Sequence, residues 1–217
     1  MQSTQSIWIK NPLAIWTGTQ NPADGGIVVR DGCIQEVLAA GQRPGDDSAM
    51  LFDASEHVVL PGLINTHHHF YQTLTRAYPD ALNKALFPWL TSLYKVWAKL
   101  DAPMLSVATE LALTELLLSG CTTAADHHYL FPDGLENAID IQAEAGHKTG
   151  MRLTLTRGSM SLGEDDGGLP PQSTVQSEAD IIEDSERLIK TYHDGQPGSM
   201  LQIALAPCSP FSVTPEL

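Results

Sequence analysis

The chain has 217 residues, of which 42% are hydrophobic, and 12 lysines and arginines against 26 aspartates and glutamates give it a formal net charge of −14. This length and apolar share are sufficient for a globular core. The acidic balance argues against a nucleic-acid partner, since phosphate binding requires a basic surface, and no apolar stretch approaches the roughly 20 residues of a membrane helix.

The first residues and the cysteines indicate the compartment. Met1 to Gln5 lack the basic and apolar segments of a secretory signal, which predicts a cytoplasmic protein. Cys33, Cys121 and Cys208 are widely spaced and form no CxxC pair, so neither a disulfide framework nor a cysteine zinc site is predicted. We expect a small-molecule partner, no nucleic acid and no membrane, and a homo-oligomer remains open.

Short strands are predicted in the N-terminal part of the chain. Apolar runs occupy residues 7–9 and 13–16. The segment 26–37 contains two apolar runs separated by Asp31-Gly32, a pattern typical of a β-hairpin. We therefore predict a small β module, of the β-sandwich type, over residues 1–56.

From His57 onwards strands alternate with helices, which is typical of parallel βα units. Strands are predicted over residues 63–69, 121–126, 151–157 and 201–206. Helices are predicted over residues 88–100, between Asp101 and Gly120, over residues 135–145 and from Ser177, which forms a capping-box pattern with Asp180. The long loop 159–176 is of the kind that is functional or disordered in compact domains.

The segment 60–69, with the sequence LPGLINTHHH, is the most informative part of the chain. In an extended strand side chains alternate between faces, so His67 and His69 project together and His68 points the other way. Two imidazoles on one rigid strand can bind zinc or iron. The alternative is a histidine-rich surface turn.

This segment resembles the first barrel strand of the amidohydrolase superfamily, whose signature is PGxINxHxH. The stretches FYQTLTRA (70–77), TTAADHH (122–128) and GSMSLGE (158–164) are similar to the branch of that superfamily that deaminates aminated heterocycles. The resemblance covers nearly the whole chain. It implies an α/β fold with a TIM-like (β/α)8 barrel, of which residues 57–217 form about the first half, because a complete barrel takes about 250 residues.

The resemblance also implies a metal site. In this superfamily the HxH pair, a histidine from strand five and an aspartate from strand eight hold the metal, while a glutamate near strand five and a histidine from strand six move protons. Only the HxH pair, His67 and His69, can be placed here, and the other groups are expected beyond Leu217. Residues 201–208 contain no lysine that could bridge two ions, so one divalent metal is predicted, zinc or alternatively iron(II).

Other polar residues are candidates for substrate contacts. Gln72 follows the histidine pair closely, and its carboxamide could donate to and accept from a purine or triazine edge, or simply be solvated. Arg157 ends the third barrel strand and could orient a substrate carbonyl oxygen. His127 and His128 end the second strand, at the face where barrel sites lie. One of them could line the pocket, and the favoured alternative is a histidine satisfied by a neighbouring carboxylate such as Asp126. A core position is predicted for Trp89, with a pocket wall as its alternative, and a buried thiol for Cys208.

The function implied by the resemblance is metal-dependent hydrolytic deamination of an aminated aromatic heterocycle, an oxidised purine such as 8-oxoguanine. Hydrolysis of a triazine or a cyclic amide is an alternative within the same chemistry. A second alternative is a non-catalytic fragment that lacks half of the metal ligands, since two histidines alone should hold zinc weakly.

Overall fold

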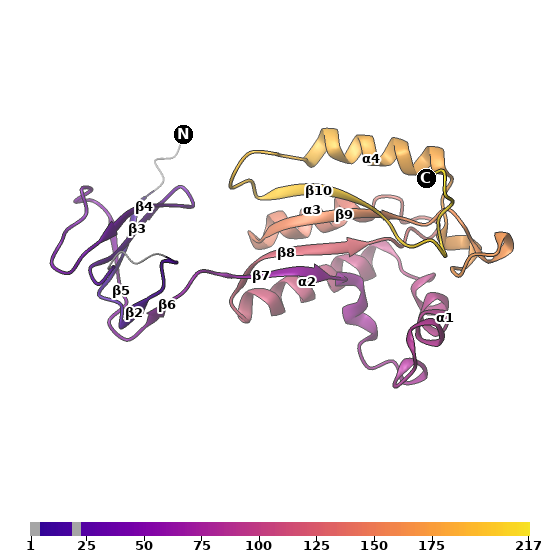
Figure 1. Ribbon diagram of the computed structural model, residues 1–217, viewed down its shortest axis with the longest axis horizontal. Helices are drawn as coiled ribbons and strands as arrows, with labels where there is room; N and C mark the ends of the chain where they lie inside the picture. The colour runs from indigo at the N-terminus through magenta and orange to yellow at the C-terminus, as the bar shows by residue number, and fades with distance from the viewer. Residues whose placement is uncertain (1–4, 19–22) are drawn as a thin grey trace. The chain divides into compact units, whose positions relative to one another are not determined.

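The computed structural model describes residues 5–18 and 23–217, and the chain divides into two compact units, Met1–Gly62 and Leu63–Leu217 (Figure 1). Each unit has its own sheet structure. Among the helices of the described residues, none combines the length and the apolar character that a membrane crossing requires.

The first unit contains a four-stranded sheet and a short two-stranded one. The larger sheet has the order β4-β3-β1-β5, formed by β1 (Ile7–Lys10), β3 (Gly26–Arg30), β4 (Cys33–Leu38) and β5 (Met50–Asp53). The smaller sheet pairs β2 (Ala14–Ile15) with β6 (Val58–Val59) in parallel. Whether these sheets belong to a β-sandwich stays a prediction.

The hairpin predicted around Asp31-Gly32 is confirmed. Strands β3 and β4 pair antiparallel, with Arg30 opposite Cys33. Asp31 and Gly32 have φ angles of 53° and 72°. Two positive φ angles in a two-residue loop match the twist of the flanking strands, and aspartate followed by glycine adopts them at low cost.

The second unit is built on a parallel sheet with the order β10-β9-β8-β7. Its strands are β7 (Leu63–His68), β8 (Cys121–His128), β9 (Arg152–Ser159) and β10 (Leu201–Pro207). Its α-helices are α1 (Leu86–Trp97), α2 (Ala102–Leu118), α3 (Ala138–Thr149) and α4 (Glu178–Tyr192). The predicted βα alternation is confirmed, and because the strands are parallel their carboxyl ends meet at one edge of the sheet.

Helices α2, α3 and α4 pack against β8, β9 and β10 in that order (Figure 1). Short 3-10 turns occupy the connections: η1 (Phe70–Thr75) and η2 (Pro79–Ala81) after β7, and η3 (Glu164–Asp166) and η4 (Gln172–Thr174) in the long loop after β9. The core between the helices and the sheet is apolar, with Leu105, Leu113 and Leu155 fully buried. This packing fixes the strand ends that carry the candidate site.

Two predicted helix starts are confirmed by their caps. The Asp101 side chain accepts the Met104 N–H at 2.8 Å, and Ser177 accepts the Asp180 N–H at 3.1 Å. Each bond satisfies a backbone donor that has no partner within the helix.

The predicted end of α3 at Gly146 is wrong, because the helix continues to Thr149 and ends at Gly150. Gly150 has a left-handed φ of 71°, which is the usual helix C-terminal conformation for glycine. Gly146 instead lies inside the helix at a close contact with β9, where a Cβ atom would stand 2.5 Å from Leu153 Cδ1. Its small size therefore serves packing rather than chain reversal.

Candidate functional site

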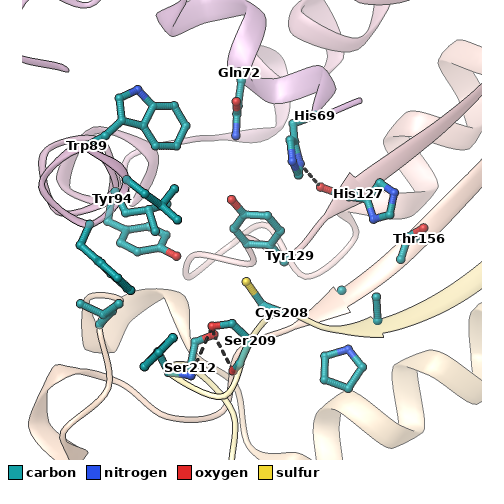
Figure 2. A pocket seen from close by; sticks show the side chains of 18 of the residues that line it. His69, Gln72, Trp89, Tyr94, His127, Tyr129, Thr156, Cys208, Ser209 and Ser212 are labelled. Carbon is teal, nitrogen blue, oxygen red and sulfur yellow. Dashed lines mark hydrogen bonds between the residues drawn. The ribbon is translucent and has the colours of Figure 1, made fainter. Parts of the chain in front are cut away.

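A cavity of about 420 Å³ lies at the carboxyl ends of the parallel strands (Figure 2). Each strand end contributes side chains or backbone to its wall, and α1 covers one side with large apolar residues. The wall includes His67, His69, Gln72, Phe87, Trp89, Tyr94, His127, Tyr129, Thr156, Gly158, Leu169, Cys208, Ser209 and Phe211. A concave site with aromatic walls and a few converging polar groups has the size and character of a small-molecule pocket.

The two histidines of the HxH pair converge at this wall. His67 Nε2 and His69 Nε2 are 3.2 Å apart, and the two rings are nearly perpendicular. Two nitrogen ligands of a tetrahedral zinc ion, each about 2.05 Å from the metal, would lie about 3.3 Å apart. The spacing of the two nitrogens therefore fits a shared divalent ion. Among the described residues no group of three or more histidine, cysteine, aspartate or glutamate side chains is arranged to hold a metal.

The tautomer of His69 is set by β8. His69 Nδ1 lies 2.7 Å from the backbone carbonyl oxygen of His127, which can only accept, so the Nδ1 atom carries the proton (Figure 2). The Nε2 lone pair is then directed at the cavity. Burial lowers the pKa of His69 to about 4, against the raising effect of the bond to His127, so the ring is neutral at physiological pH. A neutral imidazole oriented by a backbone carbonyl is the form that binds a metal ion.

His127 also supports His67 directly. The two rings are stacked, with centroids 4.5 Å apart and an angle of 24° between their planes. His68 occupies a different environment, beside the buried ring of Phe70 at a centroid distance of 5.1 Å. The alternation predicted for the three histidines is reflected in these contacts, because His67 and His69 face each other and His68 does not join them.

Within the described part of the chain, the Asp126 carboxyl forms no hydrogen bond with the imidazole of His127 or His128, so the favoured pairing is wrong. Its buried carboxyl accepts the Phe70 N–H at 2.6 Å and Gln142 Nε2 at 2.7 Å. His128 is fully buried and donates Nε2–H to the carbonyl oxygen of Leu130 at 2.6 Å. The two histidines thus differ: His127 lines the cavity, whereas His128 belongs to the core.

Gln72 lies at the cavity wall. Its side chain lines the cavity together with His67 and His69, and Nε2 donates to the Tyr71 hydroxyl at 3.3 Å. No donor to its carboxamide oxygen is found among the residues that the structure describes. The substrate-binding role of Gln72 itself stays a prediction.

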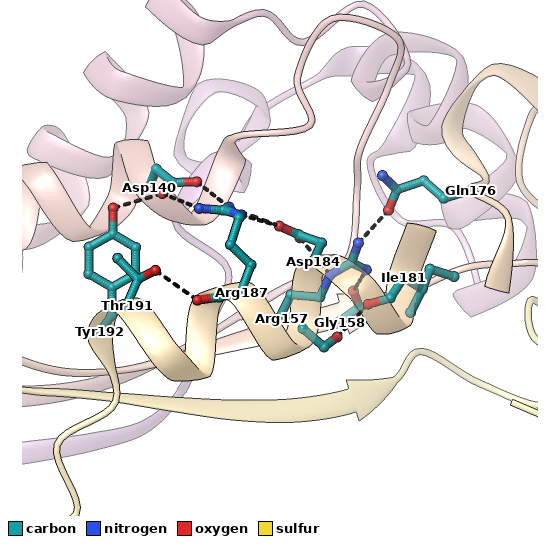
Figure 3. A network of polar contacts seen from close by, with 10 residues as sticks. Asp140, Arg157, Gly158, Gln176, Ile181, Asp184, Arg187, Thr191 and Tyr192 are labelled. Carbon is teal, nitrogen blue, oxygen red and sulfur yellow. Dashed lines mark hydrogen bonds and ion pairs between the residues drawn. The ribbon is translucent and has the colours of Figure 1, made fainter. Parts of the chain in front are cut away.

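Arg157 lies away from the cavity, in a network on the helix side of the sheet (Figure 3). Its guanidinium has no exposed surface and donates to Asp184 Oδ2 at 3.0 Å, to Gln176 Oε1 at 2.7 Å and to the Gly158 carbonyl at 2.7 Å. It also lies over the ring of Phe131, with the guanidinium carbon 4.2 Å from the centroid. This placement favours a structural role over the predicted contact with a substrate carbonyl.

Several wall residues were not predicted as site residues, above all Tyr129, Tyr94 and Thr156. Tyr129 could have been found, because it comes two positions after His127 and therefore faces the same side of β8. Trp89 lines the cavity, as the alternative to its predicted core position had it, and Cys208 also borders the cavity. Tyr94 depends on how α1 packs against the strand ends, which no local pattern reveals.

The family model described as "Amidohydrolase family" matches residues 58–217. The chain is 66% identical, over 97% of its length, to an 8-oxoguanine deaminase from Pseudomonas aeruginosa, and the match covers 47% of that protein.

Solved structures of triazine-hydrolysing enzymes are similar to this chain in fold. A triazine hydrolase variant superimposes with a TM-score of 0.86 at 30% identity, covering 98% of this chain and 48% of the other. An atrazine chlorohydrolase from Arthrobacter aurescens, complexed with zinc, has a TM-score of 0.84 at 29% identity, covering 97% and 48%. These likenesses imply a TIM-like barrel for the parallel α/β unit. The chain spans about half the length of the proteins it matches.

Proposed function

Because the chain belongs to the amidohydrolase family, we propose that the protein carrying it is a metal-dependent hydrolytic deaminase of an aminated aromatic heterocycle. The observation that carries this proposal is the convergence of His67 Nε2 and His69 Nε2, 3.2 Å apart, on the wall of an aromatic cavity. The 66% identity to an 8-oxoguanine deaminase supports an oxidised purine as the substrate.

His67 and His69 are proposed as ligands of one divalent metal, zinc in preference to iron(II). The zinc complex of the similar atrazine chlorohydrolase supports this choice. His67 and His69 would hold this ion at the cavity wall, where it would supply water with a pKa lowered towards neutrality as the hydrolytic nucleophile. The absence of lysine from β10 supports a single ion. Since catalytic zinc sites usually have three protein ligands, we propose that sequence outside these 217 residues supplies the rest.

The chain's own residues have three tasks in this proposal. His127 fixes the tautomer of His69 through its carbonyl oxygen. The aromatic wall formed with Trp89 and Tyr94 accommodates a flat ring and excludes bulk water. Gln72 orients the ring by hydrogen bonding to its edge. In the reaction, water oxygen bonds to the ring carbon that carries the amine, the C–N bond breaks and ammonia leaves; 8-oxoguanine and water would give urate and ammonia.

The domain organisation belongs to the same proposal. Residues 57–217 form the first half of the catalytic barrel, and residues 1–56 form part of a β-sandwich module. The four parallel strands of the second unit and the coverage of about half of each similar structure support this division.

Hydrolysis of a triazine is the second candidate, and it is favoured by the similarity to solved structures of triazine-hydrolysing enzymes. The same histidine pair and cavity would serve both reactions, because only the leaving group and ring differ. Relative rates on 8-oxoguanine, guanine and an amino- or chloro-substituted triazine separate the two candidates.

The deciding experiment measures ammonia release and bound metal in the natural protein that carries this chain. We expect deamination of 8-oxoguanine with one metal per active site, and loss of both metal and activity in His67→Ala and His69→Ala. His68→Ala is the matched control, because its side chain lies beside Phe70, and it should retain the metal. Undiminished activity in the first two variants would reject the proposal. Tight stoichiometric metal on the isolated 217-residue chain would contradict the need for further ligands.

A further inference from the structure

Tyr129 is a polar residue of the cavity wall that was not predicted as a site residue, and it lies next to the histidine pair. It follows β8 directly, and its ring packs edge to face against His69, with centroids 5.5 Å apart. Its hydroxyl projects into the space beside Gln72 (Figure 2). A group there can reach the edge of a ring bound in front of His69.

The polar side chains next to Tyr129 are those of Tyr71 and Gln72. Gln72 Nε2–H donates to the Tyr71 hydroxyl oxygen at 3.3 Å. The buried ring of Tyr71 packs edge to face against the ring of Tyr129, with centroids 5.9 Å apart. Across residues 5–18 and 23–217, no hydrogen-bond acceptor is found for the Tyr129 O–H group.

The proton stays on Tyr129 under physiological conditions. Burial raises the pKa of the Tyr129 phenol to about 12. The hydroxyl is thus a neutral donor. A donor without an acceptor in a partly buried wall complements a ligand that brings an acceptor, and it penalises a ligand that leaves the donor unpaired.

We propose that Tyr129 is a specificity-determining residue, whose hydroxyl donates to a ring carbonyl oxygen of the bound heterocycle. This inference rests on the proposed deaminase function and narrows it to substrates with an oxo group on the ring edge that faces Tyr129. Tyr71 acts as a positioning residue, since its ring packs edge to face against the ring of Tyr129. The site therefore selects oxo-substituted heterocycles over analogues that lack the carbonyl.

The test compares ligands that differ only in the carbonyl. Purine carries no oxo group. Hypoxanthine carries one on its six-membered ring, and 8-hydroxypurine carries one on its five-membered ring. Their dissociation constants are measured for the natural protein and for Tyr129→Phe, by quenching of tryptophan fluorescence and by inhibition of 8-oxoguanine turnover. We expect Tyr129→Phe to weaken the binding of one of the two oxo ligands about tenfold and to leave the affinity for purine unchanged. The ligand that is weakened identifies the carbonyl to which Tyr129 donates.

Two further variants control for side effects. Tyr71 packs against Tyr129, so the double variant Tyr71→Phe/Tyr129→Phe should show the same selectivity as Tyr129→Phe if the missing Tyr129 donor is the cause. Tyr192→Phe, on α4 and bonded to Asp140, is the matched phenol deletion outside the cavity and should change no constant.

The outcomes distinguish this inference from the proposed function. Equal weakening of all three ligands, or no weakening of either oxo ligand, would overturn the role of Tyr129 while deamination persisted. Failure of the natural protein to release ammonia from any aminated heterocycle would overturn the function itself, and the fluorescence constants would still report on the donor.

Discussion

Asp126 accepts the backbone N–H of Phe70 at 2.6 Å, and this bond attaches the end of β8 to the residue that follows His69. The carboxyl is fully buried and also accepts from Gln142 on α3. Burial raises the pKa of Asp126 to about 7, although the donated hydrogen bonds act in the opposite direction. A group that supports the histidine strand therefore ionises near neutral pH.

Asp126→Asn should remove a pH dependence of the folding stability. Because the folded pKa is raised from its ordinary value of 3.8 to about 7, the folded protein holds a proton that the unfolded chain releases. The resulting stabilisation is complete below about pH 4 and is lost as the pH rises to about 7. The measurement is urea unfolding at pH 5 and at pH 8. Between these two values, the unfolding free energy of the asparagine variant should rise relative to that of the wild type by on the order of 3 kcal/mol.

The asparagine can be accommodated because Gln142 Oε1 is buried and has no hydrogen-bond partner among residues 5–18 and 23–217. If the Gln142 amide turns over, Oε1 accepts from the new Asn Nδ2–H, and the asparagine oxygen keeps the Phe70 bond. Asp126→Ala is the control, since it leaves the Phe70 N–H unpaired and should destabilise the protein by about 1–3 kcal/mol even at high pH. A free-energy difference that stays constant with pH would show that Asp126 does not titrate in this window.

Local signals were sufficient to predict most elements of the second unit. Asp101 and Ser177 mark helix starts through bonds that span only three residues, and the Asp31-Gly32 turn determines its own hairpin. The end of α3 could not be predicted in this way. Gly146 is small because Leu153 of β9 packs against it, and that contact is a tertiary one.

The candidate site was predictable to the extent that strand alternation was applied. Alternation placed His67 and His69 on one face. In β9, Thr156 and Gly158 line the cavity. Arg157 lies between them, so the same alternation would have placed its side chain on the opposite face of the sheet, towards the helices. The α1 wall depends on packing between distant segments, so the sequence could not reveal it.

His127 should support the metal site through its ring as well as its backbone. Its imidazole stacks on His67 at 4.5 Å and so limits the rotation of a proposed ligand. We expect His127→Ala to weaken metal binding about tenfold, in line with the loss of other groups that orient a ligand, and His127→Phe to preserve it because the stacking surface remains. Competition with a chelator measures both. Equal loss in the two variants would indicate that His127 itself binds the metal.

Arg157 should act on stability rather than on substrate affinity. Arg157→Met removes the buried charge from Asp184 and should cost about 3–5 kcal/mol of unfolding free energy, while KM for the heterocycle stays near wild type. Asp184→Asn leaves the guanidinium without its counter-charge and should be similarly destabilising. The double variant should cost less than the sum, because the two changes remove one interaction. A raised KM with unchanged stability would restore the predicted substrate contact.

Gly158 should be required by the close approach of β9 to Tyr129. A Cβ atom at this position would lie 2.6 Å from Tyr129 Cβ and 2.6 Å from the His128 carbonyl oxygen, and the backbone of β8 cannot easily yield. We expect Gly158→Ala to destabilise the protein by roughly 1–3 kcal/mol and to weaken oxo-ligand binding by displacing the Tyr129 hydroxyl. Gly195→Ala is the matched control, because its nearest neighbour would be His193 Nε2 at 3.6 Å, and its effect should stay within about 0.5 kcal/mol. Thermal unfolding and ligand titration of both variants test this, and a stable Gly158→Ala protein with unchanged ligand affinity would contradict the close approach of the two strands.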